Sequence, residues 1–222
     1  MIWESSESLM GILEIVYYLL LALMALFLFL AVAVRLVRRF YHLPIPWFLA
    51  GLLDNPVRRR IQSPKKIADR LDLGLGMTVV EVGPGPGTFT IEVGARVAPE
   101  GSVYAFDISP KTIRKLLARI VKRGANNIAP VVASAYDLPL VSHSVDRVFM
   151  VAVLAEIPDR RRALREFARV LKSDGLLSIS EFVSDPDYPL RRTVIRWCHE
   201  ASFQEISKHG SLVEYTLSFR PA

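Results

Sequence analysis

One short stretch of this chain has residues whose types and spacing suit ligand binding: a carboxylate, three glycines and a threonine. Gly83, Gly85 and Gly87 stand at alternate positions in the stretch VVEVGPGPGT, in which Glu81 precedes them and Thr88 follows. The β-branched residues before the glycines predict a buried strand, and Thr88 is a predicted N-cap of the next helix. A glycine turn between a strand and a helix lets a ligand approach bare backbone and oriented N–H groups. The sequence therefore predicts a ligand site at this turn.

The spacing of these glycines distinguishes between the known nucleotide motifs. The dinucleotide fingerprint G-x-G-x-x-G requires a glycine where Thr88 stands, which disfavours a nicotinamide cofactor. A phosphate-binding P-loop requires Gly-Lys-Ser/Thr, and no lysine lies between Met77 and Glu100. The remaining pattern, E-x-G-x-G-x-G, resembles the first motif of the class I S-adenosylmethionine-dependent methyltransferases of the type 11-like kind. The resemblance implies S-adenosyl-L-methionine as cofactor, and a ligand-free glycine turn is the alternative.

A second carboxylate, Asp107, ends the next predicted strand. At this position a carboxylate can accept hydrogen bonds from both ribose hydroxyls of an adenosyl group, as the acidic residue does in the methyltransferase family. The resemblance places the following residue, Ile108, against the adenine. In the alternative interpretation Asp107 only caps the next helix, together with Ser109 and Pro110.

The resemblance extends to the third and fourth predicted strands. The stretch VVASAYDLPL resembles the family pattern G-D-A-x-x-L-P, with Ser134 where many members have an adenine-binding aspartate. Ser134 and the Ala135 backbone are therefore expected beside the adenine, and Val151 is expected at the methionine end of the cofactor. Transfer of an activated methyl group depends on positioning and requires no dedicated acid or base, so the catalytic residues stay unknown. The expected substrate-side groups are Glu156, Glu181, Asp185, Asp187 and Tyr188.

Alternating strand and helix patterns from Ser63 onward predict an α/β fold. The predicted strands end in a hairpin whose turn is His209-Gly210-Ser211. We therefore expect a seven-stranded, mostly parallel, doubly wound sheet with an antiparallel tail. The class I methyltransferases that the chain resembles have a sheet of this kind. The methyltransferase domain is accordingly expected at residues 63–222.

An apolar segment precedes this domain. Residues 15–34 contain twenty residues without a charge, enough for about 30 Å of helix. Three acids come before the segment, whereas a cleaved signal peptide has a basic leader. We therefore expect one uncleaved transmembrane anchor over residues 1–40, with a buried core helix as the alternative. Three arginines between Arg35 and Arg39 follow, so the positive-inside rule predicts that the catalytic domain faces the cytoplasm.

The net charge of +6 is concentrated next to the apolar segment. Residues 35–66 hold eight bases and one acid, whereas residues 67–222 hold twenty bases and eighteen acids. Residues 41–62 combine these bases with aromatic and leucine side chains, which predicts an interfacial segment on anionic lipid; an ordinary linker is the alternative. The nearly neutral domain disfavours a nucleic-acid partner. The single cysteine, Cys198, excludes an intrachain disulfide and a cysteine metal cluster.

These features together predict a membrane-anchored methyltransferase. A lipidic or amphipathic acceptor such as a phospholipid amine, a quinone or a hydrophobic thiol or amine would explain the anchor, because a soluble polar substrate needs none. The first motif is also similar to that of bacterial phospholipid N-methyltransferases. Two other functions stay open: an NAD(P)-dependent oxidoreductase, and a non-catalytic cofactor-binding tether for a membrane partner. The sequence gives neither the methyl-accepting atom nor the oligomeric state.

Overall fold

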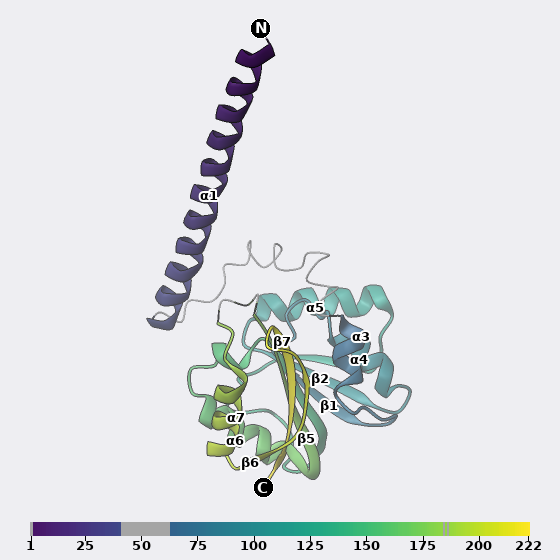
Figure 1. Cartoon of the computed structure of the whole chain (residues 1–222). Coiled ribbons are helices and arrows are strands. Elements are labelled where there is room, and N and C mark those ends of the chain that lie inside the picture. Colours follow the sequence, from purple (N-terminus) through teal and green to yellow (C-terminus); the bar gives the residue numbers. More distant parts are fainter. Residues whose placement is uncertain (1, 41–62, 184, 186) are drawn as a thin grey trace. The chain divides into compact units, whose positions relative to one another are not determined.

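The computed structural model describes residues 2–40, 63–183, 185 and 187–222. The chain divides into two compact units, Met1–Leu43 and Pro44–Ala222 (Figure 1). The predicted interfacial segment, residues 41–62, lies outside the described residues.

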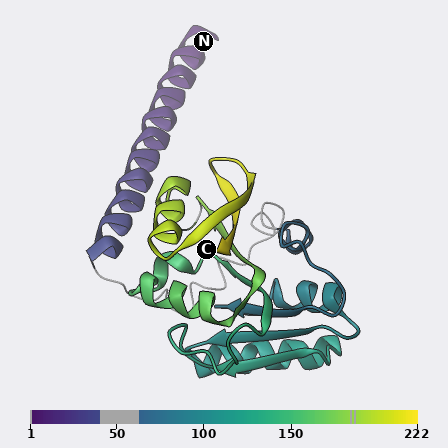
Figure 2. The ribbon, with the colours of Figure 1, turned by 90° about the horizontal axis from the view of Figure 1, so that it is seen from below.

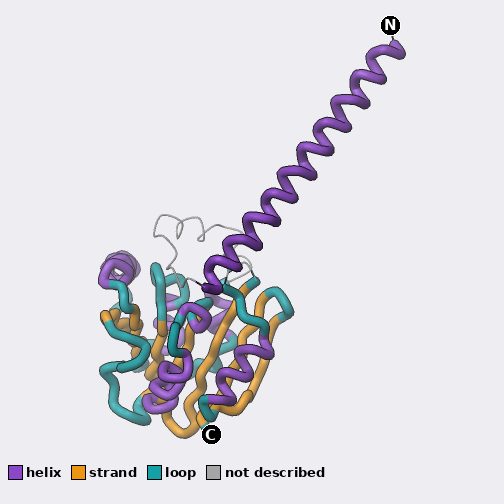
Figure 3. The backbone as a smooth tube through the Cα atoms, turned by 90° about the vertical axis from the view of Figure 1, so that its left-hand side faces the viewer, coloured by secondary structure: helices purple, strands orange, loops and turns teal. Residues whose placement is uncertain are grey.

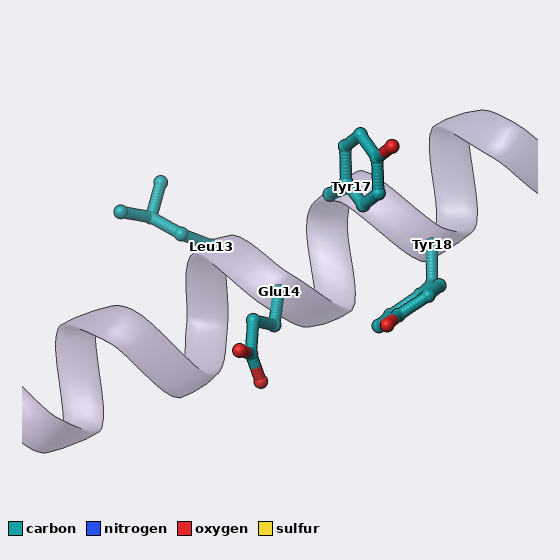
Figure 4. Close-up of a pocket in the computed structure, with 4 residues that line it drawn as sticks. All are labelled: Leu13, Glu14, Tyr17 and Tyr18. Carbon is teal, nitrogen blue, oxygen red and sulfur yellow. The ribbon is translucent and has the colours of Figure 1, made fainter.

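The first unit is one continuous helix, α1 (Ile2–Phe40). Its window Leu13–Leu30 has a mean hydropathy of 2.5, and none of it is buried inside the structure. By length and composition this window could cross a membrane, and its exposure is unlike that of a core helix. Figure 4 shows Leu13, Glu14, Tyr17 and Tyr18 projecting from the helix around a shallow surface hollow. This hollow belongs to the helical unit and contains none of the predicted cofactor residues.

The second unit is built on a seven-stranded sheet with the order β3-β2-β1-β4-β5-β7-β6. Neighbouring strands from β3 to β5 run parallel, and β7 pairs antiparallel with both β5 and β6. The predicted doubly wound sheet with an antiparallel tail is therefore confirmed. The strands are β1 (Thr78–Val82), β2 (Ser102–Asp107), β3 (Ile128–Val132), β4 (Val145–Val151), β5 (Leu171–Phe182), β6 (Phe203–Gly210) and β7 (Glu214–Pro221).

Helices cover both faces of this sheet (Figures 2 and 3). One core cluster joins the sheet to α3 (Pro64–Asp69), α4 (Thr90–Val97) and α5 (Pro110–Arg123). A second cluster joins the opposite face to α6 (Arg160–Val170) and α7 (Arg191–Glu200), and a short 3₁₀ helix, η1 (Leu154–Glu156), follows β4. This three-layer arrangement brings the carboxyl ends of the parallel strands to one edge, where ligands of open α/β sheets bind.

Two local predictions were wrong. Helix α4 begins at Thr90 with Phe89 at its N-cap position and no side-chain cap, so Thr88 does not cap it. The reason is that the glycine turn continues, with the Gly87 N–H bonded to the Pro84 carbonyl oxygen at 2.9 Å. In the hairpin, β6 extends to Gly210, so the turn lies at residues 211–213 rather than at His209-Gly210-Ser211. The positive φ of 92° at Gly210 lets β6 keep pairing with β7 up to the turn.

Candidate functional site

The three glycines of the turn have positive φ angles of 68°, 53° and 79° in chain order, but they differ in their surroundings. A Cβ atom on Gly83 would lie 2.6 Å from Val153, and one on Gly87 would lie 2.4 Å from Leu116. A Cβ atom on Gly85 would meet no atom within 4 Å. The outer two glycines are therefore required by packing, whereas Gly85 is the one that exposes its backbone to open space.

The turn is held in place by neighbouring elements at the carboxyl edge of the sheet. The Gly83 N–H donates to the Phe106 carbonyl oxygen of β2 at 2.8 Å. From α5, Arg119 donates to the Pro86 carbonyl oxygen at 3.1 Å and to the Thr88 hydroxyl at 3.4 Å. Thr88 therefore contributes to the turn as an acceptor for Arg119. The sequence pattern gave no sign of Arg119, because it lies on another element 31 residues from Thr88.

Glu81 is a buried carboxyl group directly before the turn. Its side chain is 1% exposed, and its Oε2 atom has no hydrogen-bond partner. Burial raises the pKa of Glu81 to about 8, and the nearby Thr90 hydroxyl opposes the shift. A buried acceptor without a partner is costly, so it marks a position where a ligand donor would be stabilised.

Asp107 ends β2 and begins the connection to α5. One of its carboxylate oxygens accepts a hydrogen bond from the Ser109 N–H at 2.8 Å, and the Ser109 hydroxyl accepts one from the Thr112 N–H at 3.3 Å. Burial raises the pKa of Asp107, and the bond from Ser109 opposes this shift. Asp107 therefore helps to form the start of α5, as the alternative interpretation expected. Its binding of the ribose stays a prediction. Ile108 beside it is 76% exposed, an open apolar surface of the kind on which a ring can stack.

The remaining predicted cofactor residues follow β3 and end β4. The Ser134 hydroxyl accepts from the Tyr136 N–H at 3.2 Å, and Ser134 bridges to Asp137, so this loop is folded back on itself. Ala135 is half-buried in the same loop, and Val151 packs at the rim of the core cluster under α4 and α5. The fold therefore gathers all ten predicted cofactor residues along one sheet edge. Their individual contacts with a ligand stay predictions.

A second group of polar residues lies at the end of β5. The Ala152 N–H donates to the Ser180 carbonyl oxygen at 2.8 Å, which places the end of β4 beside Glu181. Glu181 is 1% exposed, and its Oε1 atom has no hydrogen-bond partner. Burial raises its pKa well above the usual range, and the negative charges of Asp185, Glu156 and Asp187 add to the shift. The substrate-side residues expected after β4 and β5 therefore influence one another electrostatically.

Comparison with known proteins agrees with this fold. Residues 80–179 match the family model described as a methyltransferase domain. The demethylmenaquinone methyltransferase of Geobacillus stearothermophilus is 29% identical over 119 residues, which are 54% of this chain and 51% of that protein. The ubiquinone/menaquinone biosynthesis C-methyltransferase UbiE of Hahella chejuensis is 32% identical over 146 residues, 65% of this chain and 57% of that protein. The chain thus spans about half the length of the curated relatives it matches.

Solved structures share the fold at lower sequence identity. An S-adenosylmethionine-dependent methyltransferase from Aquifex aeolicus has a TM-score of 0.72 and 22% identity, covering 78% of this chain and 96% of that one. The cyclase SpnF has a TM-score of 0.64 and 16% identity, covering 72% of this chain and 80% of that one. A cyclase and a methyltransferase on one fold show that the architecture alone does not fix the reaction.

The residues at the sheet edge fit the cofactor that the family uses. Gly85 offers backbone in open space, and Glu81 carries an acceptor atom without a partner. Asp107 places a carboxylate at the end of β2, beside the exposed Ile108. These features suit an adenosyl group and a polar amino-acid tail. The unit that follows α1 therefore has the fold of S-adenosylmethionine-dependent methyltransferases, and its residues 80–179 are similar to the methyltransferase-domain family.

Proposed function

We propose that this chain is a membrane-attached methyltransferase that acts on a lipidic or hydrophobic small molecule. The observation that carries the proposal is an exposed apolar group on two loops at the carboxyl edge of the sheet. We call this group the apolar tip; its members are between 43% and 82% exposed, and they are Val183, Leu190, Leu212 and Val213. Single exposed apolar residues are ordinary, but a joined set points to an interaction surface.

Hydrogen bonds connect the two loops of the apolar tip. The Val183 N–H donates to the Val213 carbonyl oxygen at 2.9 Å, and the Tyr188 hydroxyl donates to the Leu212 carbonyl oxygen at 2.5 Å. Val183 follows Glu181 by two residues, so the apolar tip borders the substrate side of the site. A lipid that enters from a bilayer would meet this surface first.

Basic residues near the apolar tip favour an anionic membrane surface. Arg192, Lys208 and His209 are exposed on the elements that flank the two loops. Each well-placed base attracts anionic lipid by about 1 kcal/mol. The apolar window Leu13–Leu30 of α1 would supply the attachment itself. Interfacial contact by residues 41–62 is part of the same proposal, as is a cytoplasmic position of the domain.

The names of the relatives support a hydrophobic acceptor. Two of them name demethylmenaquinone and ubiquinone/menaquinone biosynthesis, which concern lipid quinones. A third, from Halobacterium salinarum, is named an arsenite methyltransferase, so the acceptor varies among similar proteins. The comparisons therefore favour methyl transfer over nicotinamide chemistry and leave the acceptor to be identified.

In this proposal the chain mainly positions its ligands. S-adenosylmethionine supplies a methyl group that its sulfonium already activates. The Gly85 backbone would hold the amino-acid part of the cofactor, Asp107 would accept hydrogen bonds from the ribose, and Ile108 would cover the adenine. Burial at the sheet edge excludes water, and alignment of acceptor and methyl group then provides the rate enhancement.

The cofactor role of Asp107 is testable by calorimetry with the full chain. Asp107→Ala is expected to weaken S-adenosylmethionine binding by about 1 to 3 kcal/mol, through loss of charge-assisted hydrogen bonds. Ser109→Ala is the matched control, because it removes the helix cap and costs about 1 kcal/mol of stability without touching the cofactor. Equal affinity of Asp107→Ala and the unmodified chain would contradict the ribose assignment. Tight binding of NADH in place of S-adenosylmethionine would favour the oxidoreductase alternative.

The lipidic acceptor is testable with labelled S-adenosylmethionine and membrane extract. We expect label in the organic phase, at a rate reduced in a chain that begins at Ser63 and in the double variant Leu212→Ser, Val213→Ser. The control variant is Leu75→Ser, which changes an equally exposed apolar residue in the loop before β1. Label confined to water-soluble products would contradict the proposal. Binding without any turnover would favour the non-catalytic tether.

A further inference from the structure

Glu181 occupies a position where the alternation of β5 would place an apolar residue. Leu177 and Ile179 precede it on the same face of β5, and both are fully buried in the core under α6 and α7. Glu181 lies opposite Tyr215 of β7, another fully buried residue. A buried carboxyl group with an unpaired oxygen is destabilising, whereas leucine or isoleucine would extend the core. Its presence therefore points to a function at this end of the strand.

The hydroxyl groups of two neighbouring tyrosines, Tyr215 and Tyr188, already have partners. The Tyr215 hydroxyl donates to the Pro189 carbonyl oxygen at 2.7 Å, and the Tyr188 hydroxyl donates to Leu212. The two rings meet edge to face with their centroids 5.6 Å apart. Neither tyrosine donates to the Oε1 atom of Glu181, so a ligand donor is the partner that this atom lacks.

The charged groups around Glu181 make the local field negative. Glu156 from η1 and Asp185 and Asp187 from the loop after β5 all disfavour its ionised form. Of the bases, Arg191 donates to the Ser211 carbonyl oxygen at 2.9 Å, and its guanidinium lies 5.6 Å from the centre of the Tyr215 ring.

Arg160 makes its hydrogen bonds to the backbone after β4, and its charge also acts on Asp187. It donates to the Leu154 and Ala155 carbonyl oxygens at 3.2 and 2.6 Å, and its guanidinium lies 4.6 Å from the centre of the Trp197 ring. No ion pair to Glu181 occurs among the residues that the structure describes. Three further carboxylates near an unpaired carboxyl group would repel an anion and attract a cation.

We propose that the methyl acceptor is a protonated amine on an apolar body, and that Glu181 binds this amine and takes its proton. This inference rests on the proposed methyl transfer. An ammonium group would donate a hydrogen bond to the unpaired Oε1 atom. It would also offset the negative charge of Glu156, Asp185 and Asp187, which we call the acidic group. The acidic group extends outward, because Glu156 is exposed and Asp187 is half-buried. The apolar tip beside it suits the apolar body of such an amphipathic amine.

The proton transfer is needed because an ammonium nitrogen has no lone pair. The bound ammonium favours the ionised form of Glu181, which loses its proton to solvent as the amine binds. The carboxylate then accepts one proton from the ammonium and becomes neutral, and the nitrogen regains its lone pair. That pair forms the new N–C bond to the methyl group while the C–S bond breaks and its electrons remain on sulfur. The products are a methylated ammonium and S-adenosylhomocysteine, and Glu181 returns its proton to solvent. A general base of this kind contributes about 10²- to 10⁴-fold in rate.

The experiment uses the full chain, labelled S-adenosylmethionine and three kinds of vesicle. One kind contains phosphatidylethanolamine as a primary-amine lipid, one contains only phosphatidylcholine, and one contains phosphatidylcholine with a lipid hydroquinone. We expect methylation of the amine lipid alone. Methylation of the hydroquinone and not of the amine would overturn the amine assignment while leaving the proposed methyltransferase function intact. Absence of turnover on all three, with cofactor still bound, would contradict the proposed function itself.

The variant Glu181→Gln tests the role of Glu181 separately from the identity of the methyl acceptor. It keeps the shape of the side chain and removes the carboxylate that would accept the proton. We expect kcat on the amine lipid to fall at least 100-fold, with S-adenosylmethionine affinity within twofold of the unmodified chain. Activity of the variant should recover as the pH rises toward the pKa of the amine, because solvent then supplies the neutral amine. The control is Glu156→Gln, an exposed member of the same acidic group, for which we expect a change in KM rather than in kcat. An unchanged kcat in Glu181→Gln would overturn the role of Glu181.

A structural defect would be recognised by thermal unfolding. Replacing a buried carboxyl group by a neutral amide is expected to leave Tm unchanged or higher. Loss of kcat together with a lower Tm and a lost pH recovery would assign Glu181 to structure instead.

Discussion

At the scale of single residues, substitution of Gly85 can distinguish two reasons for a glycine: a left-handed backbone conformation and contact with a ligand. Gly85 and Gly124 both have positive φ angles, 53° and 64°, and neither would bring a Cβ atom within 4 Å of a neighbour. Alanine at either position should therefore cost a similar 1 to 2 kcal/mol of stability, about the cost of a left-handed conformation. Gly85→Ala should also weaken S-adenosylmethionine binding about tenfold or more, since its backbone faces the proposed ligand.

Gly124 supplies the control, because it ends α5 away from the glycine turn. Gly124→Ala should leave cofactor affinity unchanged in the same calorimetric titration. Gly87→Ala should lose the most stability, since its Cβ would lie 2.4 Å from Leu116. Equal affinities for Gly85→Ala and Gly124→Ala would rule out a ligand contact at Gly85.

The buried carboxyl of Glu81 makes the stability of the cofactor-free protein depend on pH. Burial raises its pKa from 4.5 to about 8, so the folded protein keeps a proton that the unfolded chain releases above pH 4.5. The free energy of unfolding is therefore highest below that value, and this group lowers it by about 1.4 kcal/mol per pH unit up to pH 8. Glu181, with its pKa raised too, acts in the same direction.

Chemical denaturation between pH 5 and pH 8 measures this dependence. Glu81→Gln should flatten the decline, because the variant has no proton to lose. Glu166→Gln is the control: the hydrogen bond from Arg169 lowers the pKa of Glu166, so its contribution is lost only as the pH falls below its usual range. A decline that is as steep in Glu81→Gln as in the unmodified chain would show that Glu81 is not its source.

At the scale of elements, an ion-pair group fixes α3 to the sheet. Glu214 at the start of β7 pairs with Lys66 at 2.9 Å and with Arg70, which also donates to the Thr216 hydroxyl at 3.2 Å. Burial raises the pKa of Glu214, but hydrogen bonds from Lys66 and Arg70 outweigh burial and lower it. Glu214→Gln should therefore loosen α3 by about 1 to 3 kcal/mol, since it leaves a half-buried guanidinium without its charge partner.

Hydrogen exchange of the Ile67 and Leu71 amides would report this change. Asp69→Asn is the matched control on the same helix, because Asp69 is 62% exposed and pairs with Arg96 at the surface. Exposed pairs contribute about 0 to 1 kcal/mol, so little change is expected there. Faster exchange in Asp69→Asn than in Glu214→Gln would mean that α3 is held by other contacts.

At the scale of the whole molecule, the charge distribution predicts an orientation. By the positive-inside rule, the acids before residue 15 and the arginines after residue 34 would place the N-terminus outside and the domain inside. A reporter fused after Ala222 should therefore resist external protease in intact cells. Replacing Arg35, Arg38 and Arg39 by glutamate should weaken or invert this orientation, whereas replacing the distant Arg161, Arg162 and Arg165 should not. Cleavage of the reporter in the unmodified protein would contradict the orientation.

The sequence by itself determined the fold class and the location of the glycine turn. These features depend on local patterns: β-branched runs form strands, Ser109 and Pro110 begin α5, and positive φ angles favour glycine. The order of elements then implied the sheet, because parallel strands joined by helices permit few topologies. The alternate glycines and Asp107 likewise lie at fixed offsets along the chain, so the resemblance to the methyltransferase motifs was visible in the sequence.

Only the tertiary structure decided which side chains meet across the fold. Arg119 reaches Thr88 from another helix, and Glu214 joins Lys66 although 148 residues separate them. Helix α4 begins two residues after Thr88, because the turn that holds the glycines extends to Phe89. The unpaired oxygen of Glu181 is visible only once β7 and the loop after β5 cover it. Burial and pairing depend on neighbours that are distant in sequence, and local propensity carries no information about them.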